Sequence, residues 1–186
     1  MGNKIIAIVG MCGSGKSEVV KVFGEHGFLN VYFGEATFDE MKRQNLEITP
    51  ENEKKIREQL RAGGDRAIYA KLSLDKIKEA RKKGDVTIES MYSWAEYEFI
   101  KQEFGADFEA VAVVTDKDLR YERLTKREFR PLTLEQARER DRSEIANIDK
   151  AEPIAVADYY ILNNGTQNAL IKNTEQVIEK IRLKRA

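Results

Sequence analysis

Residues 10–17 have the sequence Gly-Met-Cys-Gly-Ser-Gly-Lys-Ser and fit the phosphate-binding pattern Gly-x-x-x-x-Gly-Lys-Ser/Thr at every fixed position. Glycines allow the backbone of such a loop to curl, so that successive N–H groups point into one concavity that binds anions. The ammonium of Lys16 would reach the β- and γ-phosphates of a nucleotide, and the Ser17 hydroxyl would coordinate a Mg²⁺ ion that bridges the same oxygens. We therefore predict nucleotide contacts from Gly10, Cys12, Gly13, Ser14, Gly15, Lys16, Ser17 and Glu18.

The residues on both sides of this loop supply the context that the pattern requires. Residues 4–9 form an apolar, β-branched run that indicates a buried strand, and residues 18–26 are apolar on one helical face. An ordinary glycine-rich turn is the alternative interpretation, which the order of strand, loop and helix disfavours. Cys12 occupies a variable position and lacks an evident histidine partner, so we interpret it as a small filler residue rather than a nucleophile.

Acidic residues follow other predicted strands. Glu89 ends the apolar run 86–88, where a carboxylate would hold Mg²⁺ or its water, or would orient an attacking hydroxyl group. The alternative is a carboxylate that only caps the next helix. Lys16, Glu35, Glu89 and Asp116 all come just after predicted strands, so they could share one crevice at the carboxyl ends of a parallel sheet.

A predicted helical hairpin carries arginines on both of its arms. They recur at helical spacing on the first arm and continue through the loop and the second arm: Arg120, Arg123, Arg127, Arg130, Arg138, Arg140 and Arg142. Guanidinium groups stabilise the charge of a transferring phosphoryl group, so residues 127–142 are predicted to form a lid that closes over phosphates. Glutamates are interleaved with these arginines, and a solvated hairpin held by ion pairs is the alternative.

Strands and helices alternate along the chain. Apolar runs predict strands at 4–9, 28–33, 85–89, 109–115 and 157–162. Helical patterns predict a largely helical region at 36–83 and further helices at 93–104, 116–126, 133–145 and 167–185. Within them, Thr49 and Thr133 are predicted helix caps, with Pro50 at the first helical position and Gln136 completing a capping box. This alternation predicts an α/β fold in which helices cover both faces of a parallel sheet.

The composition predicts one domain over residues 1–186 and limits the classes of partner. Lys and Arg number 32, as do Asp and Glu, so the chain has no net charge that would favour nucleic acid or an acidic membrane. A single cysteine excludes an internal disulfide. No apolar run is long enough to span a membrane, and a predicted strand begins within four residues of the N-terminus, where a signal peptide would lie. Both observations favour a cytoplasmic protein without a signal peptide or membrane span. A monomer and a homodimer are both compatible with the sequence.

Three further segments carry a resemblance to a known family. They are Ile88-Glu89 followed by Ser93-Trp94-Ala95-Glu96, then Arg140-Asp141-Arg142-Ser143-Glu144, then Ala157-Asp158-Tyr159-Tyr160-Ile161-Leu162-Asn163-Asn164-Gly165. With the phosphate loop, they resemble the P-loop kinases of small metabolites, the adenylate kinase and dephospho-CoA kinase group. The chain looks closest to an archaeal branch described as dephospho-CoA kinase-like, and the likeness covers nearly its whole length.

This resemblance implies a P-loop NTPase fold of three α/β/α layers, five parallel strands and ATP as phosphoryl donor. It implies that Arg123 lies against adenine, beside the loop of Asn163 and Gly165, and that Arg127 contacts phosphates. It also implies that the helical region 36–83 holds the acceptor, with Glu35 nearby. The lid residues Arg140 and Arg142 would then reach the transferred phosphoryl group.

Two positions depart from the family pattern. Relatives carry arginine where this chain has Phe38 and Tyr92, and both positions belong to the acceptor side. Losing both would remove two charges and ten hydrogen-bond donors. We therefore hypothesise an acceptor less charged than a nucleoside monophosphate, with a planar group that stacks on Phe38 or Tyr92. Substitution of the lost charges by Arg43 or Arg57 is the alternative, as is loss of acceptor phosphorylation.

Two functions follow from these expectations. The leading one is ATP-dependent phosphoryl transfer to a small molecule, a nucleotide or a dephospho-CoA-like acceptor. The alternative is a regulatory or switch protein that binds ATP and hydrolyses it slowly, which the loss of two arginines favours and the arginine-bearing hairpin disfavours. A GTPase is less favoured, because Thr115-Asp116-Lys117-Asp118 lacks the asparagine of the guanine-reading motif.

Overall fold

The computed structural model describes residues 2–128 and 130–184. Within them lies a five-stranded, fully parallel sheet in the order β2-β3-β1-β4-β5. Its strands are β1 (Ile5–Val9), β2 (Leu29–Tyr32), β3 (Val86–Glu89), β4 (Phe108–Val114) and β5 (Tyr159–Leu162). In the register of the central strand, Ile5 is opposite both Val86 and Phe108. The predicted five-stranded parallel sheet is confirmed.

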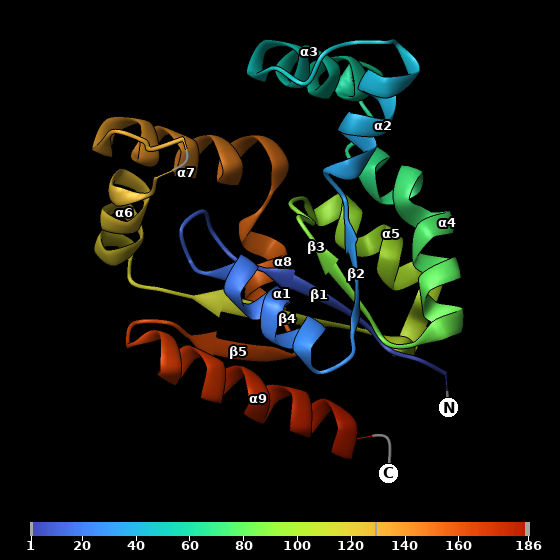
Figure 1. The fold of residues 1–186 in the computed structure, drawn as a ribbon, viewed down its shortest axis with the longest axis vertical. Helices are drawn as coiled ribbons and strands as arrows, with labels where there is room; N and C mark the ends of the chain where they lie inside the picture. Colours follow the sequence, from blue (N-terminus) through green and yellow to red (C-terminus); the bar gives the residue numbers. More distant parts are fainter. Residues whose placement is uncertain (1, 129, 185–186) are drawn as a thin grey trace.

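Helices cover both faces of this sheet, as Figure 1 shows. One face packs on α1 (Lys16–Glu25) and α9 (Gln167–Leu183), and the other on α4 (Ile68–Lys83), α5 (Trp94–Phe104) and α8 (Ala151–Ala155). The central strand is buried on both sides: Ile6 and Ile8 belong to the first core, and Ile5, Ala7 and Val9 to the second. An apolar run without alternation is what a strand covered on both faces requires. The expected α/β/α layering is confirmed.

The helical region predicted at 36–83 consists of α2 (Glu35–Arg43), α3 (Pro50–Arg61) and α4. The predicted cap of α3 is confirmed, because the Thr49 side chain accepts a hydrogen bond from the Asn52 amide and Pro50 begins the helix. We refer to α2 and α3 as the acceptor arm. They extend beyond the carboxyl ends of the strands, on the side of β2 (Figure 1).

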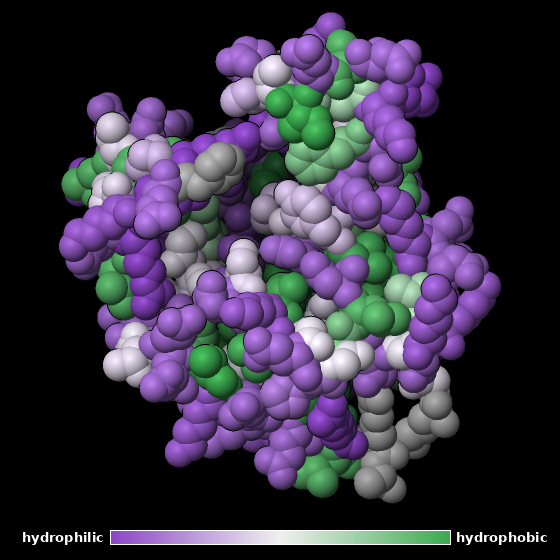
Figure 2. All heavy atoms as spheres, viewed as in Figure 1, coloured by the Kyte–Doolittle hydropathy of each residue, from purple (hydrophilic) through white to green (hydrophobic). Residues whose placement is uncertain are grey.

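The arginine-bearing hairpin consists of α6 (Lys117–Lys126) and α7 (Leu134–Ile148), and we refer to it as the lid. The predicted capping box of Thr133 and Gln136 is confirmed at the start of α7. The predicted loop 129–133 and the predicted final helix to 185 each include one residue, 129 and 185, outside the described part of the chain. Figure 2 shows the surface hollowed between the lid and the acceptor arm.

Two short helical elements connect larger ones. A 3₁₀ turn, Gly105–Asp107, connects α5 to β4, and the short helix α8 precedes β5. Neither was expected from the sequence. None of the helices in the described part of the chain combines the length and the apolar character that a membrane-crossing segment needs.

Candidate functional site

The loop between β1 and α1 has a backbone that only glycine fits at two of its positions. Gly10 has φ +149°, and a Cβ atom there would lie 2.5 Å from the Val113 carbonyl oxygen. Gly15 has φ +97°, and a Cβ atom there would lie 2.2 Å from the Asn163 side-chain nitrogen. Both distances are far below van der Waals contact, so the phosphate pattern matches a local conformation that side chains exclude.

Residues from the ends of two other strands hold this loop in place. The Asn163 amide donates to the Ser14 carbonyl oxygen at 2.8 Å, and the Thr115 hydroxyl donates to the same oxygen at 3.0 Å. Arg123 of the lid donates to the Asn163 carbonyl oxygen at 3.0 Å. The resemblance placed Arg123 and Asn163 together, whereas the role of Thr115 was missed because one threonine after a strand has no distinctive spacing.

Two buried polar atoms near this loop have no hydrogen-bond partner among the described residues. They are the Ser14 hydroxyl oxygen and the Nη1 nitrogen of Arg123. Buried polar groups are rarely left unpaired, and an unpaired one indicates a missing ligand, water or ion. The residues present therefore fit a polar ligand that extends from the loop towards Arg123.

Lys16 lies folded over the loop and donates from its ammonium to the Met11 carbonyl oxygen at 2.9 Å. Burial, followed by the nearby charge of Lys150, lowers the pKa of Lys16 to about 8. A cation held away from water beside the loop amides has a strong field for an entering anion.

Ser17 and Glu89 come together as predicted, with the hydroxyl and one carboxylate oxygen 3.4 Å apart. The other carboxylate oxygen of Glu89 accepts from the Asn30 amide at 3.1 Å, which fixes the orientation of the group. The described residues contain no cluster of three or more His, Cys, Asp or Glu suited to a metal. Mg²⁺ bound with a nucleotide does not require one, because waters and phosphate oxygens complete its coordination. The pair therefore fits Mg²⁺.

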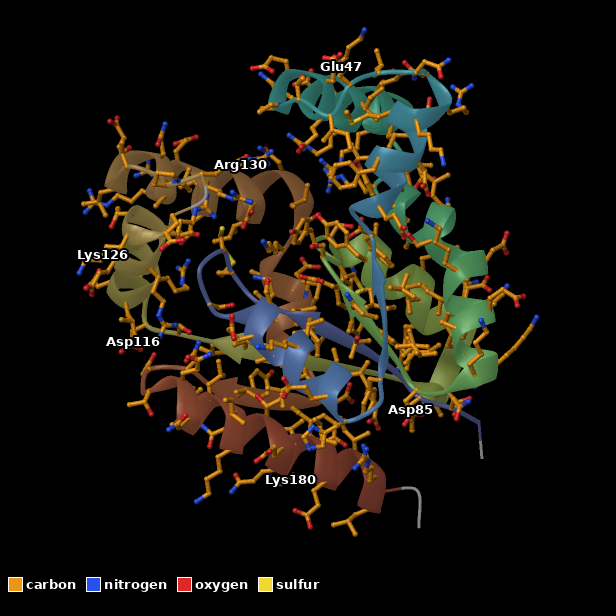
Figure 3. All side chains as sticks on the ribbon, viewed as in Figure 1. Glu47, Asp85, Asp116, Lys126, Arg130 and Lys180 are labelled. Carbon is orange, nitrogen blue, oxygen red and sulfur yellow. The ribbon has the colours of Figure 1, made fainter. Side chains whose placement is uncertain are left out.

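A cavity of about 400 Å³ lies between the lid and the acceptor arm, and it reaches the carboxyl end of β3 at Ser90, next to Glu89. Its lining contains four arginines, Arg57, Arg61, Arg130 and Arg140, and four aromatic residues, Tyr32, Phe38, Tyr69 and Tyr92. Arg130 reaches from the lid to α3 (Figure 3), where it donates to both carboxylate oxygens of Glu53 at 3.0 and 3.3 Å. The guanidinium of Arg61 lies 4.9 Å from the centre of the Tyr69 ring.

This lining changes the interpretation of the two departures from the family pattern. Phe38 and Tyr92 line the cavity, as expected for the acceptor side. The two aromatic residues do not leave the cavity without cations, because α3 and the lid supply guanidinium groups. The hypothesis of a less charged acceptor stays a prediction. Of the two proposed substitutes, Arg57 lines the cavity, whereas Arg43 is exposed and paired with Glu40 at 2.6 Å.

The lid arginines occupy different environments. Arg140 lines the cavity and donates to Glu144 at 3.0 Å. Arg142 lies on the outer face of α7, with its side chain 80 % exposed and 3.9 Å from Glu139, because residues two apart on a helix point in opposite directions. Arg127 is half-buried and donates to the Arg130 carbonyl oxygen at 2.5 Å, at the entrance to the lid loop.

A buried ion pair joins the two helices of the lid. Arg120 donates through both terminal nitrogens to the carboxylate of Asp141, at 2.6 and 3.1 Å, and Asp141 also accepts from the Tyr121 hydroxyl. The same guanidinium donates to the Cys12 carbonyl oxygen at 3.0 Å. The lid is therefore attached directly to the phosphate loop. Cys12 itself packs against a small apolar cluster of the lid, which agrees with a filler role.

Three other predicted site residues lie further from the cavity. Glu35 begins α2, pairs with Lys76 at 3.0 Å and is not part of the cavity lining. Glu18 accepts from Gln167 of α9 at 3.2 Å, at the outer end of the loop. Gly165 follows Asn163 in the turn between β5 and α9, where a Cβ atom would meet Ala169 only at 3.5 Å.

The structure adds residues that the sequence did not indicate. Arg61 lies on α3 one helical turn after Arg57. Charged residues four positions apart are common on exposed helices, so this spacing did not mark Arg61 as a site residue. Lys150 follows the end of α7 and is buried beside Glu144, at 2.6 Å. No motif marks this lysine, since only the fold brings the end of α7 to the phosphate loop.

Comparison with known proteins assigns the chain to a family. The model of a family described as an AAA domain matches residues 6–147. A UPF0200 protein of Pyrococcus horikoshii is 35% identical over 185 residues, covering 95% of this chain and 97% of that protein. A shikimate kinase from Bacteroides thetaiotaomicron aligns with a TM-score of 0.62 at 12% identity, over 96% of this chain and 98% of that one. A dephospho-CoA kinase from Campylobacter jejuni aligns with a TM-score of 0.61 at 17% identity, over 98% of both chains.

The two kinases share the fold with this chain, which is a P-loop kinase-like α/β fold. The match to the UPF0200 relative extends over the phosphate loop, the acceptor arm and the lid. The chain therefore belongs to the UPF0200 family, and the model of an AAA domain matches it over residues 6–147.

Proposed function

We propose that this protein transfers a phosphoryl group from ATP to a small anionic acceptor. The observation that carries this proposal is the cavity between the lid and the acceptor arm, which guanidinium groups line from both sides. A nucleotide on the loop would place its terminal phosphate at the mouth of this cavity. The solved structures with the same fold include kinases of shikimate and of dephospho-CoA, which agrees with this reaction class.

The residues divide the work of such a reaction. The loop amides and Lys16 bind the donor phosphates, and Ser17 and Glu89 would hold Mg²⁺, which neutralises charge on the phosphate oxygens. Glu89, at the carboxyl end of β3, would also orient the acceptor hydroxyl. Arg140 extends towards the same space and stabilises the charge on the phosphoryl group in transit. Catalysis of this kind depends on positioning and electrostatics.

The cavity supports an acceptor with at least one anionic group and a planar or apolar portion. Four arginines exceed the two carboxylates of the lining, Glu53 and Glu96, so the cavity carries excess positive charge. Glu53 already accepts from Arg57 and Arg130, and Glu96 accepts from the amides of Tyr92 and Ser93. The aromatic residues would contact a ring of the acceptor. A nucleotide and a dephospho-CoA-like molecule both meet this description.

The first prediction concerns Lys16 and tests the nucleotide site. Lys16→Ala should weaken ATP binding at least about tenfold, because hydrogen bonds to charged groups contribute about 1.5–3 kcal/mol. Titration calorimetry with ATP and Mg²⁺ measures this, and Lys21→Ala, an exposed lysine on the same helix, is the control. Equal affinities for both variants and the unchanged protein would contradict the proposed role of the loop.

A panel of acceptors then separates the two candidate functions. ADP formation should rise above the acceptor-free rate with one of the nucleoside monophosphates, dephospho-CoA or a hydroxy acid such as shikimate. ATP binding with the same slow ADP formation for every acceptor would instead favour the switch protein.

A further inference from the structure

A buried lysine beside the phosphate loop has no role in the mechanism described above. Lys150 follows α7 directly after Asp149 and is only 3 % exposed. Its ammonium donates to Glu144 at 2.6 Å and lies 4.3 Å from the centre of the Tyr92 ring. Lysine is rarely buried unless it is paired, so its position requires an explanation.

The local backbone places Lys150 there. Asp149 ends α7 in the left-handed conformation, with φ +55°, and is held by Arg66 at 2.6 Å. The chain consequently folds back, and the Lys150 amide donates to the Glu144 carbonyl oxygen at 3.2 Å. Lys150 therefore contacts Glu144 through its backbone and its side chain. A left-handed conformation at a residue other than glycine is strained and persists only where its surroundings hold it.

Glu144 is shared between two cations. Its carboxylate accepts from Arg140 at 3.0 Å through one oxygen and from Lys150 at 2.6 Å through the other. Lys150 is also the nearby charge that contributes most to the lowered pKa of Lys16. Arg140 and Lys150 thus share the single carboxylate of Glu144, and the charge of Lys150 acts on the nearby Lys16.

The surrounding acidic groups do not balance this charge, since they have partners of their own. Asp141 pairs with Arg120, and Glu89 contacts Ser17 and Asn30. Burial raises the pKa of Tyr92 to about 12, so its ring is a neutral surface under Lys150. The single negative charge of Glu144 does not neutralise both of its partners, and a phosphate group with two negative charges would balance the remaining positive charge.

We propose that Lys150 is a positioning residue of the phosphoryl-transfer site: through Glu144 it holds Arg140 over the phosphate loop, and its charge favours a bound triphosphate over a diphosphate. This inference rests on the proposed function, because it assumes a nucleotide on the loop. The terminal phosphate is the group that ATP has and ADP lacks. The ratio of the two affinities therefore reports on this cluster, whereas a merely structural lysine would change both affinities together.

Lys150→Gln tests the proposal, because glutamine retains a donor for Glu144 and removes the charge. We expect the ratio of ATP to ADP affinity, measured by titration calorimetry with Mg²⁺, to fall about tenfold, which corresponds to about 1.4 kcal/mol. Lys150→Arg should restore most of the ratio. Thermal unfolding of each variant establishes that it is folded, and Lys150→Met provides a second neutral side chain if the glutamine variant is unstable.

The chain offers a control lysine away from the phosphate loop, at the beginning of β4 and β5. Lys184 donates to Glu109 at 2.9 Å and lies 5.5 Å from the centre of the Tyr159 ring, which are the same kinds of contact as those of Lys150, but its side chain is 59 % exposed. Lys184→Gln should leave the affinity ratio unchanged. A folded Lys150→Gln or Lys150→Met variant with the ratio of the unchanged protein would overturn this inference alone. An unchanged protein that bound neither nucleotide would refute the proposed function as well.

Discussion

Substitution by alanine, which adds one methyl group, should have opposite effects at two glycines that lie nine positions apart. Gly15 has φ +97° and contacts Asn163, whereas Gly24 lies within α1 with nothing within 4 Å of a Cβ atom. Gly15→Ala should destabilise the fold by more than about 1 kcal/mol, because the left-handed region costs alanine about 1–2 kcal/mol before any collision. Gly24→Ala should stabilise it by about 0.5–1 kcal/mol, since alanine favours helices. Urea unfolding measures both changes, and an equal effect of the two substitutions would contradict the loop geometry.

The sequence could predict residues of the site where a spacing encodes the conformation. The pattern between Gly10 and Ser17 is of this kind, because glycine, lysine and serine are each required by the shape of the loop. Arg61 and Lys150 could not be predicted, since their side chains reach the cavity or the loop only through the packing of α3 and α7. The resemblance implies one role for Arg140 and Arg142, whereas the helical period places their side chains on different faces of α7.

At the scale of the elements, the pair of Arg120 and Asp141 joins α6 to α7 and is nearly inaccessible to solvent. Asp141→Ala would leave a buried guanidinium without its counterion, and breaking such pairs costs about 3–5 kcal/mol. Glu122→Ala removes an exposed pair with Lys126 on α6 and should cost less than about 1 kcal/mol. Thermal unfolding of the two variants compares them. A small loss for Asp141→Ala would show that the lid does not depend on this pair.

The sequence predicts which segments are helices and strands more accurately than it predicts the residues at which they begin and end. The capping residues Thr49 and Thr133 predict where α3 and α7 begin, because their side chains accept hydrogen bonds from the first free amides of a helix. The sequence predicts a largely helical region at 36–83 with a helix start at Pro50 and a break at residues 63–65, and the structure has three helices there. The helix α8 was missed, since five residues that include Pro153 have no recognisable helical period.

At the scale of the whole molecule, the lid helix α7 buries fewer residues than the core helix α9. Only Ala137 and Asp141 are buried in α7, whereas α9 buries five residues. ATP with Mg²⁺ at about one hundred times its dissociation constant stabilises a folded protein by about 2.7 kcal/mol. We expect amide exchange to slow more strongly over 134–148 than over 167–183, because a nucleotide would contact the lid directly. Hydrogen-exchange mass spectrometry measures this.

The same experiment has an internal control in the unliganded protein. Without nucleotide, the amides of α7 should already exchange faster than those of α9, in keeping with their smaller apolar contact. Equal slowing of both helices on addition of ATP would mean that the nucleotide binds without engaging the lid.

The bond between Asn163 and Ser14 spans 149 positions of the chain. During translation, the phosphate loop therefore leaves the ribosome long before Asn163, whose side chain holds it, is added to the chain. Until Asn163 emerges and β5 joins the sheet, the nascent chain lacks the finished anion site. Nucleotide binding during translation should consequently begin only after residue 163 has left the ribosome.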